Sequence, residues 1–411
     1  MNVLQVNYTD LDGRRFNGYD LIADLRPRGF DCKQAVLTRR SKDPAVFSLW
    51  EGTVDEGIHG ALDKIETKHS MSNLLFPWLR LLSERPEFAA ADVVHYHLIH
   101  NQMMSLFDLP WLFRMKPSVI TMHDAWFLTG RCIQPQGCER WRTGCGACPD
   151  LSTVFPMRSD HSDQMWRIKR DVFADLEADV VVASEYTRQL VRQSPITGHL
   201  PHVHLVPFGI RADSYLPDDA RATSRRVLGI PEDDFVILFR STASAYKGLR
   251  YLIDALSLRP PARPTTLLAV DQRRLLTSLA GEYNILELGW VEDESLYHMM
   301  YSAADVLVMP STAEGFGLMA LEAMAAGRPV VSFAGTAVPS VTRAPECGIA
   351  VPMGDSIALR EALDQLAANR ADALRRGQLG RRIARDEHRH ERYLDALTDV
   401  YNSAAERRRV S

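Results

Sequence analysis

The sequence has 411 residues, long enough for two or three domains of ordinary size, each with its own hydrophobic core. Its 48 basic and 52 acidic residues give a formal net charge of −4, which excludes the strong global field of a nucleic-acid-binding protein. Hydrophobic residues make up 46% and charged residues 24%, which is ordinary for a soluble globular protein.

The chain shows no sign of membrane insertion or export. Its first residues lead directly into a predicted strand, without the basic region and long apolar stretch of a signal peptide. Apolar runs stay well short of the roughly 18 residues that a membrane span needs. We therefore expect a cytoplasmic protein without a membrane span.

Short runs rich in valine, isoleucine and leucine alternate with helical patterns along the whole chain. Continuous apolar runs between helices are typical of parallel strands that are buried on both faces. This alternation predicts an α/β fold whose strands are joined through helices. The predicted strands are residues 2–8, 92–97, 118–124, 179–184, 203–209, 235–241, 265–270, 284–289, 305–311 and 329–335.

The alternation is interrupted once, over residues 209–234. This segment is polar, charged and contains proline, so it is predicted to be the linker between two Rossmann-like domains. The first domain is predicted over residues 1–212 and the second over 213–388. A helical tail is predicted over 389–411.

The segment EGFGLMALE follows the predicted strand 305–311. Two glycines flank a phenylalanine, and the Leu, Ala and Met residues after them are strong helix formers. A strand–glycine–helix junction leaves unpaired N–H groups at the start of the helix, which suit a phosphate group. Two carboxylates alone are usually a solvated face, but at this junction Glu314 and Glu322 favour phosphate and sugar binding.

Charged residues follow two further predicted strands. Arg240 ends one strand and Lys247 opens the next helix, so the two cations together can neutralise a diphosphate leaving group. His123 and Asp124 end another strand, at the carboxyl edge where parallel sheets bind their ligands. The alternatives are solvated cations near a turn and a structural histidine.

Four of the six cysteines are concentrated in one segment, residues 132–148. A four-thiolate set that includes a C-x2-C pair in a cytosolic protein favours structural zinc over disulfides. Such a site has no open position, so zinc would stabilise the loop without doing chemistry. Reduced thiols in a long loop are the alternative. The four residues are Cys132, Cys138, Cys145 and Cys148.

Arg240, Lys247, the run EGFGLMALEAMAAGRPVV and the run GDSIALREAL, in this order, resemble the family 4 retaining glycosyltransferases of the GT-B fold. The resemblance covers nearly the whole chain and is strongest over residues 235–365. The segment HDAWFLTGRCIQPQGCERWRTGCGACP is similar to the HDxWxxTGxC…CxxW…GCGxCP motif of one subgroup. The resemblance implies that the two Rossmann-like domains face a cleft. It also implies that the tail, residues 389–411, crosses back to the first domain.

The resemblance implies a metal-independent, retaining transfer of a hexose-type sugar from a UDP- or GDP-linked donor to a hydroxyl acceptor. A glycan, a lipid-linked sugar and a small natural product are all compatible acceptors. A GT-B epimerase or phosphorylase is the first alternative, and the Cys-rich motif argues against it. A non-catalytic nucleotide-sugar-binding protein is the second, and it would be expected to lack Glu314, Arg240 or Lys247.

The resemblance also implies a role for individual residues. The diphosphate would lie between Arg240, Lys247 and the amides of residues 315–318, with Glu314 on the transferred sugar and Glu322 on the ribose. The acceptor would bind the first domain. The catalytic residues implied are His123, Arg240, Lys247 and Glu314. The substrate-binding residues implied are Gly13, Arg14, Arg15, Asp124, Gly315, Phe316, Gly317, Leu318 and Glu322.

Two further segments have both a structural and a functional interpretation. His95, His97 and His100 suggest a metal site, but the family has a similar histidine-rich strand end without a required metal, which favours structural residues lining the cleft. Residues 70–88 are predicted as an apolar helix packed on a sheet. The alternative for this helix is contact with the acceptor or a peripheral membrane contact.

Overall fold

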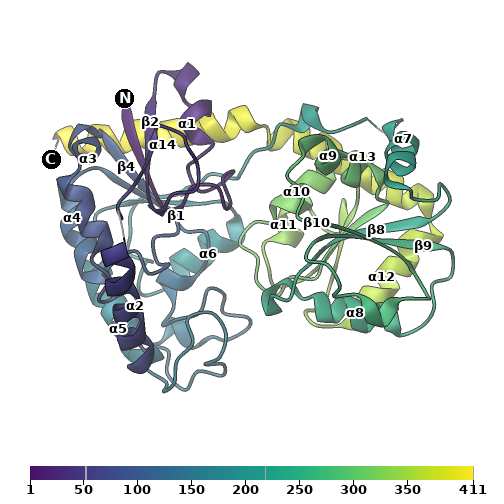
Figure 1. Cartoon of the computed structure of the whole chain (residues 1–411), viewed down its shortest axis with the longest axis horizontal. Helices are drawn as coiled ribbons and strands as arrows, with labels where there is room; N and C mark the ends of the chain where they lie inside the picture. Colours follow the sequence, from purple (N-terminus) through teal and green to yellow (C-terminus); the bar gives the residue numbers. More distant parts are fainter. Residues whose placement is uncertain (51–52, 218, 411) are drawn as a thin grey trace. The chain divides into compact units, whose positions relative to one another are not determined.

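The computed structural model describes residues 1–50, 53–217 and 219–410, and it divides into two compact units (Figure 1). Unit 1 comprises Met1–Val206 and Leu394–Ser411, and unit 2 comprises Pro207–Tyr393. Unit 2 begins at Pro207, a few residues before the predicted domain boundary at 212/213. The backbone of Ile210 is bonded to the segment around His388, which belongs to unit 2. Its N–H donates to the carbonyl of His388, and its carbonyl accepts from His390.

Unit 1 contains a seven-stranded sheet in the order β3-β2-β1-β4-β5-β6-β7, and its strand pairs are parallel. The strands are β1 (Asn2–Thr9), β2 (Asp31–Thr38), β3 (Val46–Ser48), β4 (Val93–Tyr96), β5 (Ser118–Thr121), β6 (Asp179–Val182) and β7 (Val203–Leu205). The helices are α1 (Leu21–Asp24), α2 (Thr53–Lys68), α3 (Pro86–Ala90), α4 (Leu109–Met115), α5 (Ser162–Ala174) and α6 (Glu185–Gln193). Most of α14 (His390–Val410) belongs to this unit as well.

The two faces of the unit 1 sheet have different neighbours, because successive residues of a strand point to opposite faces. On β4, the ring of His95 meets Tyr401 of α14, with 5.5 Å between the ring centroids. The next residue, Tyr96, stacks on Phe113 of α4 at 4.7 Å. One face is therefore apolar, and the other carries buried polar side chains beneath the C-terminal helix.

Unit 2 contains a six-stranded parallel sheet in the order β10-β9-β8-β11-β12-β13. Figure 1 shows α8 and α12 on one face of this sheet and α9, α10 and α13 on the other. The strands are β8 (Phe235–Ser241), β9 (Thr265–Asp271), β10 (Asn284–Gly289), β11 (Val306–Met309), β12 (Val330–Phe333) and β13 (Gly348–Val351). The helices are α7 (Ala220–Leu228), α8 (Leu249–Ser257), α9 (Glu294–Ala303), α10 (Leu318–Ala325), α11 (Val338–Val341), α12 (Ser356–Ala368) and α13 (Arg370–Glu387). The predicted α/β class with two Rossmann-like domains is confirmed.

The predicted linker over residues 209–234 is wrong as an assignment. Apart from residue 218, which lies outside the described residues, it is an ordered part of unit 2 and contains α7. Arg225 on this helix is 1% exposed, and its guanidinium donates to the carbonyls of Ala303 and Asp234 and pairs with Asp305. Arg225, which lies in the predicted linker, is thus buried and held by hydrogen bonds and an ion pair.

The apolar segment 70–88 does not form the single helix that the sequence predicts. Pro77 and Pro86 divide it into a 3-10 helix over Trp78–Glu84 and the short helix α3. Its side chains nevertheless pack into the core of unit 1, with Trp78 4% exposed. Among the helices in the described part of the chain, none combines the length and the apolar composition that a membrane span requires.

Candidate functional site

The carboxyl ends of β8 and β11 mark the candidate site in unit 2. β8 is the first strand of the unit, and the chain places β9 and β10 on one side of it and β11 to β13 on the other. Ligands of parallel α/β sheets bind at the carboxyl ends of strands where the strand order reverses in this way. Arg240 lies near the end of β8, and Glu314 follows β11.

Lys247 and Glu314 form an ion pair at this edge. The Lys247 ammonium lies 2.7 Å from the Glu314 carboxylate, and the two side chains are 30% and 17% exposed. The loop that carries Lys247 is fastened to the loop after β11, since the N–H of Thr312 donates to the carbonyl of Tyr246 at 2.8 Å. A Cβ at Gly248 would collide with the carbonyl oxygen of Pro310, so only glycine permits this approach.

The start of α10 presents backbone N–H groups beside this pair. Gly317 has a φ of +96° and precedes the helix. The first bonds within the helix run from Ala320 and Leu321 to the carbonyl of Gly317, so the N–H groups of Gly317, Leu318 and Met319 come before them. Such an end attracts anions, because the helix dipole adds to the N–H donors. The predicted strand, glycine turn and helix are all present.

The side chain of Phe316 packs into the interior of unit 2. Its side chain is 5% exposed and packs on Phe208, with 5.2 Å between the ring centroids, and on His388 at 6.0 Å. The substrate contact of Phe316 stays a prediction, and the buried ring leaves only the backbone available for it. Its ring fixes the glycine turn on the interior of unit 2.

Arg240 is held by a residue that the sequence interpretation missed. Its Nε donates to Asp271 at the end of β9, with a distance of 2.7 Å, and the Arg240 side chain is 41% exposed. Asp271 could have been found from the sequence, because it comes directly after the predicted strand 265–270. The predicted pair of cations thus exists as two separate ion pairs along one sheet edge.

Glu322 is buried and engaged by two tyrosines of α9. It is 1% exposed, and its Oε2 accepts from the hydroxyl of Tyr297 at 2.6 Å and from that of Tyr301 at 2.7 Å. Burial, and then the negative charge of Glu322, raise the pKa of Tyr301 well above its ordinary value. The Tyr301 hydroxyl therefore stays a protonated donor, and the two tyrosines together orient the carboxylate. The sequence interpretation did not find either tyrosine.

In unit 1 the loop after β1 carries the residues predicted to bind the acceptor. Gly13 has a φ of +72°, and Arg15 is exposed. Arg14 pairs with Asp20 at 2.7 Å. The amide of Asn17 donates to the carbonyls of Thr9, Asp10 and Asp12, which holds the loop in a closed turn. Arg14 is therefore partly neutralised in this structure.

His123 and Asp124 follow β5 as predicted and contact different histidines. His123 Nε2 lies 3.1 Å from Nδ1 of His97, and its ring is 5.3 Å from that of Phe16 in the loop after β1. Asp124 lies 3.1 Å from Nε2 of His100. The structure thus brings His123 to the loop with Gly13, Arg14 and Arg15.

Burial keeps the histidines near His123 neutral. It lowers the pKa of His123 to about 4, that of His95 to about 3 and that of His97 well below its ordinary value. Over the described residues, no three Cys, His, Asp or Glu side chains stand together as metal ligands. We interpret His95 and His97 as uncharged hydrogen-bonding residues.

Acid should destabilise unit 1 through these histidines. Because their pKa values are lower in the folded chain than the ordinary 6.5, the unfolded chain binds more protons as the pH falls below 6.5, and stability falls toward about pH 4. Replacing His97 by Gln should make the unfolding temperature less dependent on pH in this window. The exposed His69, replaced by Gln, is the control and should leave the slope unchanged. An equal slope in all three proteins would contradict this account.

The Cys-rich loop carries the four cysteines that the sequence predicts as zinc ligands. All six cysteines are free, and burial raises the pKa of Cys145 to about 12. The four predicted ligands are among the described residues, which contain no group of three metal-binding side chains. The loop is instead organised by Lys169, which is 0% exposed and donates to the carbonyls of Trp126 and Thr129 at 2.6 and 2.9 Å. Zinc stays a prediction from the cysteine spacing.

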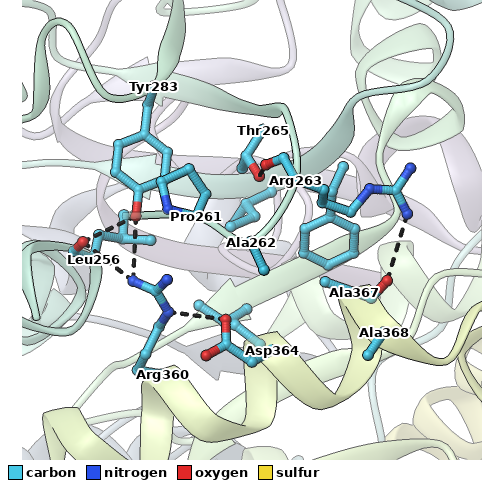
Figure 2. Close-up of a pocket in the computed structure, with 13 residues that line it drawn as sticks. Leu256, Pro261, Ala262, Arg263, Thr265, Tyr283, Arg360, Asp364, Ala367 and Ala368 are labelled. Carbon is cyan, nitrogen blue, oxygen red and sulfur yellow. Dashed lines mark hydrogen bonds and ion pairs between the residues drawn. The ribbon is translucent and has the colours of Figure 1, made fainter. Parts of the chain in front are cut away.

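A cavity of about 190 Å³ lies elsewhere in unit 2 (Figure 2). Phe235 and Thr265, which begin β8 and β9, line it, so it lies at the amino ends of these strands. Arg360 donates to the hydroxyl of Tyr283 and pairs with Asp364 at its wall. None of the predicted site residues lines this cavity, and its walls are mainly apolar.

Comparisons with known proteins agree with the geometry of unit 2. The family model "Glycosyl transferases group 1" matches residues 220–383. A D-inositol 3-phosphate glycosyltransferase from Geodermatophilus obscurus is 30% identical over 341 residues, which cover 78% of this chain and 69% of that enzyme. One from Xylanimonas cellulosilytica is 32% identical over 249 residues, and the match spans 56% of this chain and 58% of that enzyme.

The fold also occurs in a solved structure with a bound nucleotide. The structure of HepE from Anabaena in complex with UDP and glucose has a TM-score of 0.70 with this chain at 17% sequence identity. The comparison covers 98% of this chain and 100% of that chain. At this identity the likeness concerns the fold.

Proposed function

Because this chain belongs to the group 1 glycosyltransferases, we propose that it transfers a sugar from a nucleoside diphosphate sugar to a hydroxyl acceptor. The observation that carries the proposal is the Lys247–Glu314 pair beside the start of α10. It combines a cation, the backbone N–H groups at a helix start and a carboxylate at the switch point of a parallel sheet. These are the groups that a diphosphate and a sugar ring require.

Lys247 and Glu314 have separate tasks in this proposal. An ammonium has three N–H donors, so the bond to Glu314 leaves donors for the diphosphate oxygens. The carboxylate of Glu314 accepts from hydroxyls of the transferred sugar. Arg240 joins the diphosphate by exchanging part of its contact with Asp271. The positive charges offset the charge that develops on the leaving group, which is the largest electrostatic demand of the reaction.

Glu322 takes the ribose hydroxyls. Its carboxyl group is held by Tyr297 and Tyr301, whose hydroxyls both donate to Oε2. Paired ribose hydroxyls are donors that a carboxylate of fixed orientation recognises well. Gly315 and Leu318 contribute only their backbone amides.

The acceptor binds unit 1 at the loop with Gly13, Arg14 and Arg15. His123 and Asp124, which follow strand β5, contribute to the same site, and the ring of His123 lies 5.3 Å from that of Phe16 in this loop. The proposed transfer retains the anomeric configuration through substitution on one face of the sugar, with the leaving phosphate oxygen taking the proton of the acceptor hydroxyl. The charges of Lys247 and Arg240 serve where other transferases use a divalent cation.

A donor screen tests the proposed function. A ligand at 100 times its dissociation constant stabilises a protein by about 2.7 kcal/mol, which a thermal-unfolding assay detects readily. We expect UDP or GDP, and not ADP, to raise the unfolding temperature. We also expect the matching nucleotide sugars to be consumed when an acceptor is supplied. No stabilisation by any nucleoside diphosphate would contradict the proposal.

Structural zinc in the Cys-rich loop is a separate proposal that rests on the cysteine spacing. Four thiolates around Zn²⁺ carry two negative charges. Burial raises the pKa of the Cys132 thiol, while the side chains of Lys169 and Arg131 act to lower it. Purified protein should then contain about one zinc per chain. Cys145→Ser should release zinc and lower thermal stability, whereas Cys347→Ser should retain it. A metal-free protein of normal stability would reject the site.

A further inference from the structure

A chain of buried polar side chains leads from the C-terminal helix α14 to His123. Tyr401 is 0% exposed, and its hydroxyl lies 3.1 Å from Nε2 of Gln5 and 2.7 Å from Nδ1 of His95. Oε1 of Gln5 lies 2.9 Å from Nε2 of His97. Nδ1 of His97 in turn lies 3.1 Å from Nε2 of His123. All of these residues belong to unit 1.

The loop after β1 packs closely against this chain of hydrogen bonds. Gln5 and His95 are neighbours in the register of β1 and β4, so their side chains share one face of the sheet. Gly18 has a φ of +93°, and a Cβ there would lie 2.8 Å from Oε1 of Gln5 and 2.9 Å from Nε2 of His97. A glycine at this position therefore lets the loop after β1 cover the Gln5–His97 bond.

The positions of the protons follow from the bonds. The amide Nε2 of Gln5 can only donate, so the Tyr401 hydroxyl accepts from it. Oε1 of Gln5 can only accept, so Nε2 of His97 carries a proton. Nδ1 of a neutral His97 is then an acceptor, and the proton in the bond to His123 belongs to Nε2 of His123.

The assignment of the protons requires that His97 and His123 are neutral. Burial lowers the pKa of His97 well below its ordinary value and that of His123 to about 4, so each ring carries a single proton at neutral pH. With its proton on Nε2, His123 carries no proton on Nδ1. This nitrogen accepts hydrogen bonds and cannot donate them.

We propose that Tyr401 is a positioning residue that, through Gln5 and His97, holds His123 in the tautomer with its proton on Nε2. A hydroxyl that meets Nδ1 of His123 must then donate its proton. The inference rests on the proposed function for its link to substrate, while the tautomer itself is independent of that function. Through Tyr401, helix α14 thereby determines which ring nitrogen of His123 donates and which accepts.

Nitrogen-15 NMR of the full chain with labelled histidine tests the proposal. His123, identified by the resonances that are lost in His123→Gln, should show a protonated Nε2 and an unprotonated Nδ1. Tyr401→Phe keeps the ring and removes the hydroxyl that orients Gln5. In this variant His123 should show both tautomers, and kcat/KM for sugar transfer should fall about tenfold. Gln5→Met interrupts the chain at another point and should have the same effect.

Tyr96→Phe is the matched control, because it removes a buried hydroxyl from β4 on the opposite sheet face. This variant should keep the parent tautomer. The proposal is overturned if His123 of the parent carries its proton on Nδ1, or if Tyr401→Phe and Gln5→Met leave the tautomer unchanged. If the parent transfers no sugar, the proposed function fails, while the NMR result still decides the tautomer.

Discussion

Replacing Lys247 by alanine should lower kcat/KM for sugar transfer by about 10²–10³, which corresponds to ~3–4 kcal/mol of transition-state stabilisation. The variant removes the cation that lies 2.7 Å from Glu314 beside the start of α10. It also leaves the Glu314 carboxylate, which is 17% exposed, without this partner and able to repel a diphosphate. The affinity for nucleoside diphosphate, measured by calorimetry, should fall together with the rate.

Arg250→Ala is the control for this variant. Arg250 is an exposed cation on the neighbouring helix α8, so its removal changes the charge of unit 2 equally. It should change kcat/KM less than threefold at physiological ionic strength, because exposed charges are screened over about 8 Å. Equal losses in both variants would mean that Lys247 contributes only to a general positive field.

Glu314→Gln and Glu322→Gln should affect different kinetic constants. In the proposed function Glu314 contacts the sugar that is transferred, so its replacement should lower kcat by about 10²-fold and change the dissociation constant of nucleoside diphosphate little. Glu322 is proposed to contact the ribose, so its replacement should weaken nucleoside diphosphate binding by about tenfold, with a smaller loss of kcat at saturating donor. The amide is nearly the same size as the carboxylate, so both variants should fold.

The measurement is a donor titration of each variant with nucleoside diphosphate affinity determined in parallel. Glu282→Gln removes an exposed carboxylate of the same unit and should behave like the parent. Equal, small effects at Glu314 and Glu322 would mean that the two carboxylates are only structural. The buried position of Glu322 beneath Tyr297 and Tyr301 makes a structural contribution measurable as a lower unfolding temperature.

The sequence allowed the strands and the positions at their ends to be predicted. Each of the predicted strands overlaps a strand of the structure, because a parallel strand buried on both faces needs a continuous apolar run. β2, β3 and β13 were missed. Lys33 and Gln34 interrupt the apolar run of β2, and β3 has only 3 residues. β13 begins with a glycine, which weakens the strand pattern.

The partners of the site residues could not be predicted, because they come from segments far apart in the sequence. Asp271 pairs with Arg240 only because β9 lies beside β8. Tyr297 and Tyr301 meet Glu322 through the packing of α9. Tyr401 reaches His95 across 306 positions of the chain. The sequence shows which side chains can do chemistry, while their orientation depends on tertiary packing.

Hydrogen exchange of the full chain with and without the nucleoside diphosphate that stabilises it tests the central claim most directly. That claim is that the diphosphate binds at the start of α10 and beside Lys247. The account predicts slower exchange in peptides that cover residues 241–248 and 314–320, with no change in those that cover 360–368 at the wall of the cavity in Figure 2. Protection that is confined to the cavity segments or to unit 1, with 314–320 unchanged, would contradict it.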